Sequence, residues 1–191
     1  MASTKKDPTS RIQTRKSESP LGAYLGDVSR VDVLKPEEEQ RLAAEIADGR
    51  VGLWRALLSY PPFATAIAEV LEPVLDADAV DPHPQAELAA IKVHSRAYRD
   101  RETKANREAF HESQQGLAAI MASLDLDGKY ADLIAADLEA IDANRREGVA
   151  LQVVHPPKGS RPFSRYIQRV RGANQALRYS KNKFVKANLR R

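Results

Sequence analysis

Apolar residues recur three and four positions apart along most of the chain, which is the spacing of helices that bury one face. The first set predicts a short helix, because Ser19 is a favourable N-cap and Pro20 fits the first turn. Its apolar face is formed by Leu21, Tyr24, Leu25 and Val28. A second helix is expected from Pro36 to Gly49, since glycine is a common stop at a helix C-terminus. Together the two helices predict a helical hairpin over 19–50.

Residues 51–160 are expected to form a variable helical insert of uneven elements. Prolines interrupt it, because proline lacks a backbone donor and disfavours helix in the residue before it. In chain order the pattern predicts a helix ending at Pro61, a helix over 63–71, an acidic linker over 74–84, a long polar helix over 85–123, an amphipathic helix over 129–146 and a loop over 148–160. The segment 149–154 has the composition of a strand, but it is short and isolated.

A long amphipathic helix is predicted over 161–191. Its apolar positions are Phe163, Tyr166, Ile167, Val170, Leu177, Phe184, Val185 and Leu189. No glycine, asparagine or proline follows the last apolar residue, so we expect the chain to end within a helix. The expected fold class is therefore all-α: a helical hairpin, an irregular helical insert and a long basic C-terminal helix.

Charge is distributed unevenly along the chain. Residues 161–191 contain ten Lys or Arg and no Asp or Glu, whereas 1–160 contain 20 basic and 26 acidic residues, a net charge of −6. A basic helix without acidic partners favours nucleic acid or an acidic protein surface, although a solvated basic face has the same composition. The cations from which we expect DNA contacts are Arg165, Arg169, Arg171, Arg178 and Lys181. Residues 1–18 are polar and are expected to be a disordered basic tail.

The composition argues against several classes of function. The chain contains no cysteine, which rules out a disulfide scaffold, a cysteine-based zinc site and thiol catalysis, and is typical of a reducing cytosol. No apolar run reaches the roughly 20 residues that cross a bilayer, so we expect a cytoplasmic protein without a membrane partner. The four histidines match no metal spacing, and no phosphate-binding loop or nucleophile motif is present. We therefore expect no enzymatic activity, no cofactor, no metal and no small-molecule substrate.

Two segments carry a more specific pattern. The first combines a Tyr-Leu helix at Ser19–Leu25, an apolar link at Arg30–Leu34 and a Glu-rich helix start at Pro36–Glu39. In this order it resembles region 1.2 of bacterial RNA polymerase sigma factors of the primary, sigma-70 type. The second segment, Lys181–Arg190, resembles the opening of sigma region 2.1. The helical residues between them are similar in architecture to the variable, non-conserved region of that family, which would make 161–191 the start of region 2.

The resemblance implies a sigma factor, in the form of an N-terminal part or a truncated chain, for DNA-templated transcription initiation. Its partners would be RNA polymerase core and promoter DNA. The resemblance also implies that Tyr24 and Leu25 contact single-stranded promoter DNA and that Arg30 contacts a phosphate. A plain packing role for Tyr24 and Leu25 fits the same pattern. The chain departs from the family at Gly26, where a basic residue is usual, and this should weaken the DNA contact.

The largest departure is at the C-terminus, where the family continues into the helices that read the promoter. We therefore expect a truncated chain that does not recognise promoters alone. In such a chain Phe184, Val185 and Leu189 would fold back on the hairpin, find a partner or fray. The alternative functions are a stand-alone helical regulatory protein, derived from a sigma factor, that binds RNA polymerase or nucleic acid, and a purely structural helical bundle.

Overall fold

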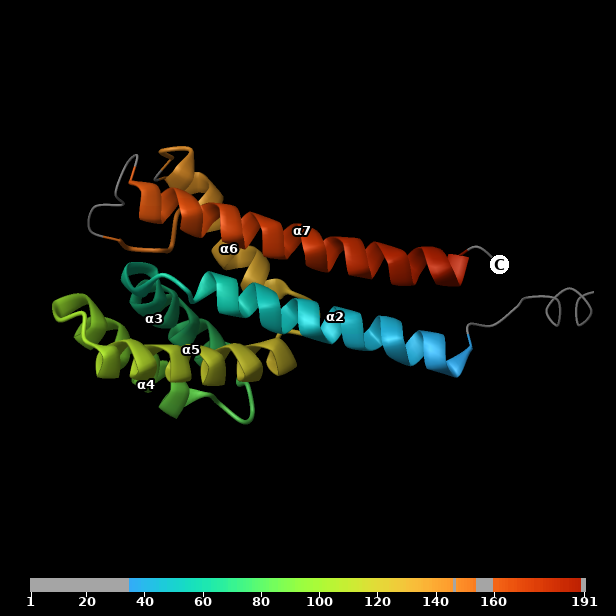
Figure 1. Ribbon diagram of the computed structural model, residues 1–191, viewed down its shortest axis with the longest axis horizontal. Coiled ribbons are helices and arrows are strands. Elements are labelled where there is room, and N and C mark those ends of the chain that lie inside the picture. Colours follow the sequence, from blue (N-terminus) through green and yellow to red (C-terminus); the bar gives the residue numbers. More distant parts are fainter. Residues whose placement is uncertain (1–34, 146, 154–159, 190–191) are drawn as a thin grey trace, which may run out of the picture.

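All regular structure in the described part of the chain is helical, which confirms the predicted all-α class (Figure 1). The computed structural model describes residues 35–145, 147–153 and 160–189. The elements are α2 (Pro36–Leu57), α3 (Pro61–Ala77), α4 (Gln85–Asp100), α5 (Lys104–Leu124), α6 (Lys129–Asp142) and α7 (Arg161–Leu189). The first predicted helix, and with it one half of the predicted hairpin, lies outside these residues. No strand forms at 149–153.

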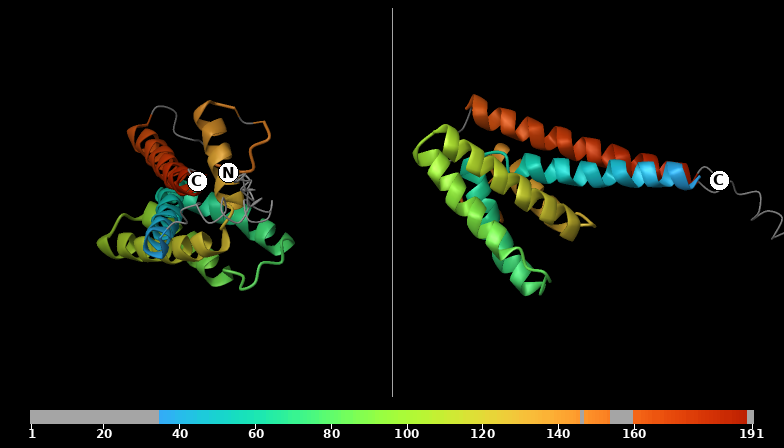
Figure 2. Two further views of the ribbon diagram at one scale, coloured as in Figure 1. Left: turned by 90° about the vertical axis from the view of Figure 1, so that its right-hand side faces the viewer. Right: turned by 60° about the horizontal axis from the view of Figure 1, so that its bottom comes forward.

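α2 and α7 lie side by side and antiparallel, and they form the long axis of the molecule (Figures 1 and 2). The other helices gather around the C-terminal half of α2: α5 and α6 pack against it, α4 packs against α5, and α3 packs against α4. The N-terminal half of α2 and the C-terminal half of α7 extend together beyond these helices (Figure 1). We call residues 36–46 of α2 and 176–189 of α7 the two-helix arm.

α2 continues through Gly49, so the helix stop predicted at that residue is wrong. Pro36 occupies the first turn, and acidic side chains follow where the helix dipole favours them. A glycine inside a helix costs only about 1 kcal/mol relative to alanine, and burial of Leu53 and Leu57 outweighs this cost. The domain boundary predicted after residue 50 therefore falls inside one continuous helix.

The single long helix predicted over 85–123 is wrong, because the segment forms two helices, α4 and α5. Arg101 is extended, and the Thr103 hydroxyl accepts a hydrogen bond from the Asn106 N–H at 3.1 Å. Thr103 is thus the N-cap of α5. The Asn106 side chain also donates to the Arg101 carbonyl at 2.8 Å, which stabilises the turn. This reversal of the chain lets α5 pack on α2 while α4 packs on α3.

α3 extends to Ala77, into the segment that was expected to be a linker. Pro73 lies inside this helix, where it removes one backbone hydrogen bond and crowds the preceding turn. Leu75 lies beyond the proline and is fully buried in the core. The apolar area that Leu75 buries helps to offset the cost of the proline, and the irregular connection to α4 is limited to 78–84.

The core includes Trp54, which is buried near the C-terminal end of α2, and an aromatic cluster. The cluster consists of Tyr60, Phe63, Phe163 and Tyr166. Ring centroids lie 5.3 Å apart for Tyr60 and Tyr166 and 5.4 Å apart for Phe63 and Phe163, distances typical of favourable aromatic pairs. The first turns of α3 and α7 are therefore packed against each other at the end of α2.

Two side chains from other helices bind carbonyl groups at the end of α2. The last carbonyls of a helix have no partner within the helix and need one elsewhere. The Tyr166 hydroxyl of α7 donates to the Leu57 carbonyl at 2.8 Å. The Gln114 amide of α5 donates to the Arg55 carbonyl at 2.6 Å. These bonds fasten α5 and α7 to the same turn of α2.

Replacement of Tyr166 by phenylalanine tests this anchor. The substitution leaves the buried Leu57 carbonyl without its donor, which should lower the free energy of unfolding by about 1–3 kcal/mol. Urea denaturation followed by circular dichroism measures the loss. Tyr179→Phe removes a hydroxyl from an exposed tyrosine of the same helix and should change the free energy by less than about 0.5 kcal/mol. Equal losses of unfolding free energy in the two variants would show that the hydrogen bond from Tyr166 to the Leu57 carbonyl does not stabilise the fold.

Candidate nucleic-acid interface

The apolar face of α7 determines where its cations point. Ser160 precedes the helix, and its hydroxyl accepts a hydrogen bond from the Phe163 N–H at 3.3 Å, as an N-cap does. The buried side chains of the helix are Phe163, Tyr166, Ile167, Val170 and Leu177. Because this face packs toward α2 and α6, most of the basic residues are confined to the two flanks and the outward face.

The five cations predicted to contact DNA on α7 do not form one stripe. Arg165 and Arg169 are exposed and lie one turn apart on one flank. Arg171 and Arg178, two turns apart, lie on the opposite flank, because two residues rotate a helix by roughly 200°. Lys181 is half-buried. The structure therefore brings the predicted cations together as two pairs rather than as a single patch.

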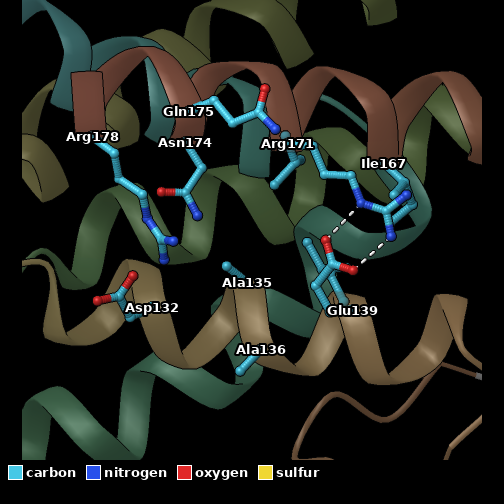
Figure 3. A pocket seen from close by; sticks show the side chains of 11 residues that line it. Asp132, Ala135, Ala136, Glu139, Ile167, Arg171, Asn174, Gln175 and Arg178 are labelled. Atoms are coloured by element: carbon cyan, nitrogen blue, oxygen red, sulfur yellow. Dashed lines mark hydrogen bonds and ion pairs between the residues drawn. The ribbon is translucent and has the colours of Figure 1, made fainter. Parts of the chain in front are cut away.

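Arg171 and Arg178 border a groove between α6 and α7 with a volume of about 480 Å³ (Figure 3). Its apolar lining includes Ala135, Leu138, Ile167 and Val170. Its polar lining combines the carboxylates of Asp132 and Glu139 from α6 with the two arginines and Asn174 from α7. The groove is thus acidic on one wall and basic on the other.

Arg171 is engaged within the protein. Its Nε and Nη2 atoms donate to the two carboxylate oxygens of Glu139 at 2.7 and 2.6 Å, and Nη2 also donates to Asp142 at 2.8 Å. These hydrogen bonds lower the pKa of Glu139 and raise the pKa of Arg171. The bidentate contact fastens α6 to α7 and neutralises the charge of this cation.

Arg178 and Lys181 reach toward the start of α6. Figure 3 shows the Arg178 side chain pointing from α7 into the groove, toward Asp132. The Lys181 Nζ lies 3.8 Å from the position that a Cβ would take at Gly128, in the turn before α6. Both cations therefore sit beside the acidic wall of the groove, whereas Arg165 and Arg169 face solvent.

The two-helix arm is joined by an ion pair across its helices. The Lys183 Nζ donates to both carboxylate oxygens of Glu45 at 2.9 and 3.2 Å. Glu45 also accepts from Arg41 at 2.6 Å within α2. The hydrogen bond from Lys183 is the main reason that the pKa of Glu45 is lowered. Sequence patterns gave no sign of this pair, because its residues are 138 positions apart.

The apolar residues near the end of α7 fold back on α2 in part. Leu177 packs over Gly49, whose missing side chain allows a close approach: a Cβ placed there would lie 3.1 Å from the Leu177 Cδ1. Phe184 is half-buried, whereas Val185 is about half exposed. The structure therefore shows partial burial for Phe184 and exposure for Val185, while the side chain of Leu189 is not among those described.

The described ranges offer neither a metal site nor a membrane span. No group of three or more histidine or carboxylate side chains there could hold a metal ion. None of the helices described is long and apolar enough to span a membrane.

A comparison with protein-family models assigns the N-terminal segment. Residues 19–51 match the family described as sigma-70 factor, region 1.2. This match confirms the resemblance drawn from the Tyr-Leu helix and the Glu-rich helix start, and it points to a role related to sigma factors in transcription. No curated protein and no solved structure matches the chain.

The match and the described structure overlap in the first part of α2. Residues 35–51 carry the N-terminal side of the two-helix arm, including Glu45. Tyr24, Leu25 and Arg30 fall within the match but outside the described residues. The match does not extend to 181–190, so the resemblance of that segment to region 2.1 stays a prediction.

The contact between Glu139 and Arg171 predicts a specific dependence of stability on pH. Because the pKa of Glu139 lies below its ordinary value of 4.5, the contact stabilises the fold above that pH, and the stabilisation is lost as the pH falls through the lowered pKa. At neutral pH, Glu139→Gln should lower the free energy of unfolding by only about 0.2–1 kcal/mol, since both side chains are partly exposed to solvent.

The measurement compares the free energy of unfolding of the two proteins by urea denaturation at neutral and acidic pH. The difference between wild type and Glu139→Gln should shrink as the pH falls below about 4.5. Glu112→Gln removes an exposed carboxylate on α5 and serves as the control. A difference that stays constant, or grows, as the pH falls would exclude the ion pair as its source.

Proposed function

We propose that the chain acts in DNA-templated transcription initiation as the N-terminal portion of a sigma-70-type factor that associates with RNA polymerase core and promoter DNA. One observation carries the proposal: the helix that begins in the region 1.2 match is held along the acid-free helix α7. The Glu45–Lys183 ion pair joins the two helices within the arm. The match supports a sigma-related role, and we propose that the two-helix arm is the surface through which the chain binds its partners.

The arrangement of the two resembling segments supports the proposal. Lys183 belongs to the segment similar to the opening of region 2.1, and Glu45 belongs to region 1.2. In the sequence the whole helical insert separates them, yet in the structure they form one antiparallel pair (Figure 1).

We assign DNA binding to cations of α7 that are exposed and are not neutralised by a carboxylate of α6. Arg165 and Arg169 are exposed, while Arg171 is neutralised by Glu139 and Asp142. Each phosphate contact releases counterions, so binding through these arginines falls steeply with salt. Tyr24 and Leu25, with Arg30, are proposed to add contacts to single-stranded promoter DNA. The apolar Val185 is proposed as part of the polymerase contact, because it is exposed on the arm.

The second candidate is a stand-alone regulatory protein that binds RNA polymerase or nucleic acid but does not take part in initiation. The confinement of the family match to residues 19–51 favours it, since binding alone needs no further sigma region. In this case the chain would bind core polymerase without contributing to open-complex formation. A purely structural bundle would bind neither partner.

Binding assays with matched arginine variants test the proposal. The full chain should co-elute with RNA polymerase core, and it should bind a forked promoter fragment with an affinity that falls with salt. The double variant Arg165→Ala, Arg169→Ala should reduce the slope of log affinity against log salt by roughly 1.4–1.8, because two phosphate contacts are lost. Arg171→Ala is the control, and it should leave that slope nearly unchanged while lowering stability.

Three results would contradict the proposal. Failure of the chain to associate with core polymerase would remove the sigma-related role. If Arg171→Ala reduced the salt dependence of binding as much as the Arg165/Arg169 double variant, DNA binding could not be assigned to the flank that carries Arg165 and Arg169. Promoter-specific transcription by this chain with core polymerase alone would contradict its role as an N-terminal portion that is not sufficient for promoter recognition.

A further inference from the structure

The outward face of α7 within the two-helix arm presents an aromatic ring among polar donors. Tyr179 has 71% of its surface exposed, more than Val93 or Leu126, the next most exposed large apolar side chains in the described ranges. Single exposed apolar side chains are common on protein surfaces and need no function. The surroundings of Tyr179 are what set it apart.

Those surroundings are basic and free of carboxylates on the same helix. Asn182, Lys183 and Lys186 follow Tyr179 by three, four and seven residues, so all four side chains share one face. They line, with Ala187, a shallow depression of about 390 Å³. No Asp or Glu occurs anywhere in 161–191. A polyanion that approaches this face therefore meets no like charge from α7.

We propose that this face of α7 binds single-stranded nucleic acid by stacking one unpaired base on Tyr179. Lys186 contacts a phosphate of the same strand, and Asn182 lies between them as a hydrogen-bond donor and acceptor. Lys183 also lines the depression, and its ion pair with Glu45 joins α7 to α2 beside the site. The inference deepens the proposed function, because it adds a DNA contact that is separate from Arg165, Arg169 and region 1.2.

The spacing suits a short single strand. Seven residues of helix separate Tyr179 from Lys186 and rise about 10 Å, which is the length of about three stacked nucleotides. Aromatic stacking combined with backbone cations is the usual way in which proteins hold single strands without reading their sequence. A duplex offers no free base face to the ring, and an acidic protein helix would use the lysines but not the aromatic plane. The presence of both groups on one face favours a single strand.

Fluorescence anisotropy with the full chain tests the inference. The probes are a fluorescein-labelled 12-nucleotide oligothymidine, an abasic strand of the same length and a 12-base-pair duplex. Tyr179→Ala should weaken binding of the oligothymidine roughly 5- to 100-fold, the effect of losing one stacked base, and leave the abasic strand and the duplex within about twofold. Tyr179→Phe keeps the ring and should retain binding of the oligothymidine within about twofold.

Two lysine variants separate stacking from charge. Lys186→Ala should weaken the oligothymidine and the abasic strand by the same factor, because the lysine contacts only phosphate. Lys104→Ala, at an exposed position on α5, is the control for loss of one positive charge and should have little effect on any probe. Circular dichroism should show unchanged helix content in all four variants, since the replaced side chains are exposed.

The inference is overturned if Tyr179→Ala has no effect on the oligothymidine, or if it weakens the abasic strand equally. It is also overturned if polyglutamate competes as well as the oligothymidine, because the face would then be an acidic-protein site. If Tyr179→Ala still associates with core polymerase and binds oligothymidine as the wild type does, the inference is wrong but the proposed function is retained. If the wild-type chain does not associate with core polymerase, the proposed function is wrong, whatever the effect of Tyr179→Ala on oligothymidine binding.

Discussion

The burial of the C-terminal end of α2 is the constraint on which the rest of the structure depends. Trp54 and Leu57 are removed from water there, and the carbonyls of the last turn take donors from α5 and α7. A helix end of this kind is stable only when other elements satisfy its carbonyl groups. Gln114 and Tyr166 do so from positions 59 and 109 residues further along the chain. They thereby bring the insert and the last helix to the same place.

The two-helix arm follows from this anchor. Once the first turn of α7 is fixed at the end of α2, a helix of 29 residues that packs along α2 runs back past its whole length. Leu177 then reaches Gly49, and Lys183 reaches Glu45. The same packing turns Arg171 toward α6 and leaves Arg165, Arg169 and Tyr179 in solvent. The part of α2 that lies in the region 1.2 match and the basic helix α7 are thus neighbours on one surface.

Local signals in the sequence were sufficient for the helical class, the start of α2 at Pro36 and the buried face of α7, because each depends on near neighbours. Gly49 has the local signal of a helix stop, but the burial of Leu53 and Leu57 that continues the helix is a tertiary effect. The turn between α4 and α5 had a local signal, the cap at Thr103, which the sparse apolar spacing obscured. The partners of Arg171 lie about 30 residues away and had no signal, so this cation was predicted to be free for DNA.

A cysteine cross-link between α2 and α7 tests the central claim, that α7 is held along the helix that begins within the region 1.2 match. The chain contains no cysteine, so Gly49→Cys with Leu177→Cys introduces a single possible disulfide. A Cβ at residue 49 lies 3.6 Å from the Leu177 Cβ, within the range of about 3.5–4.5 Å that disulfides require. We expect a rapid intramolecular disulfide and undiminished association with core polymerase after oxidation. Gly52→Cys with Leu177→Cys, which points the first thiol into open space, should not cross-link. Absence of the 49–177 disulfide, or loss of polymerase association on its formation, would contradict the account.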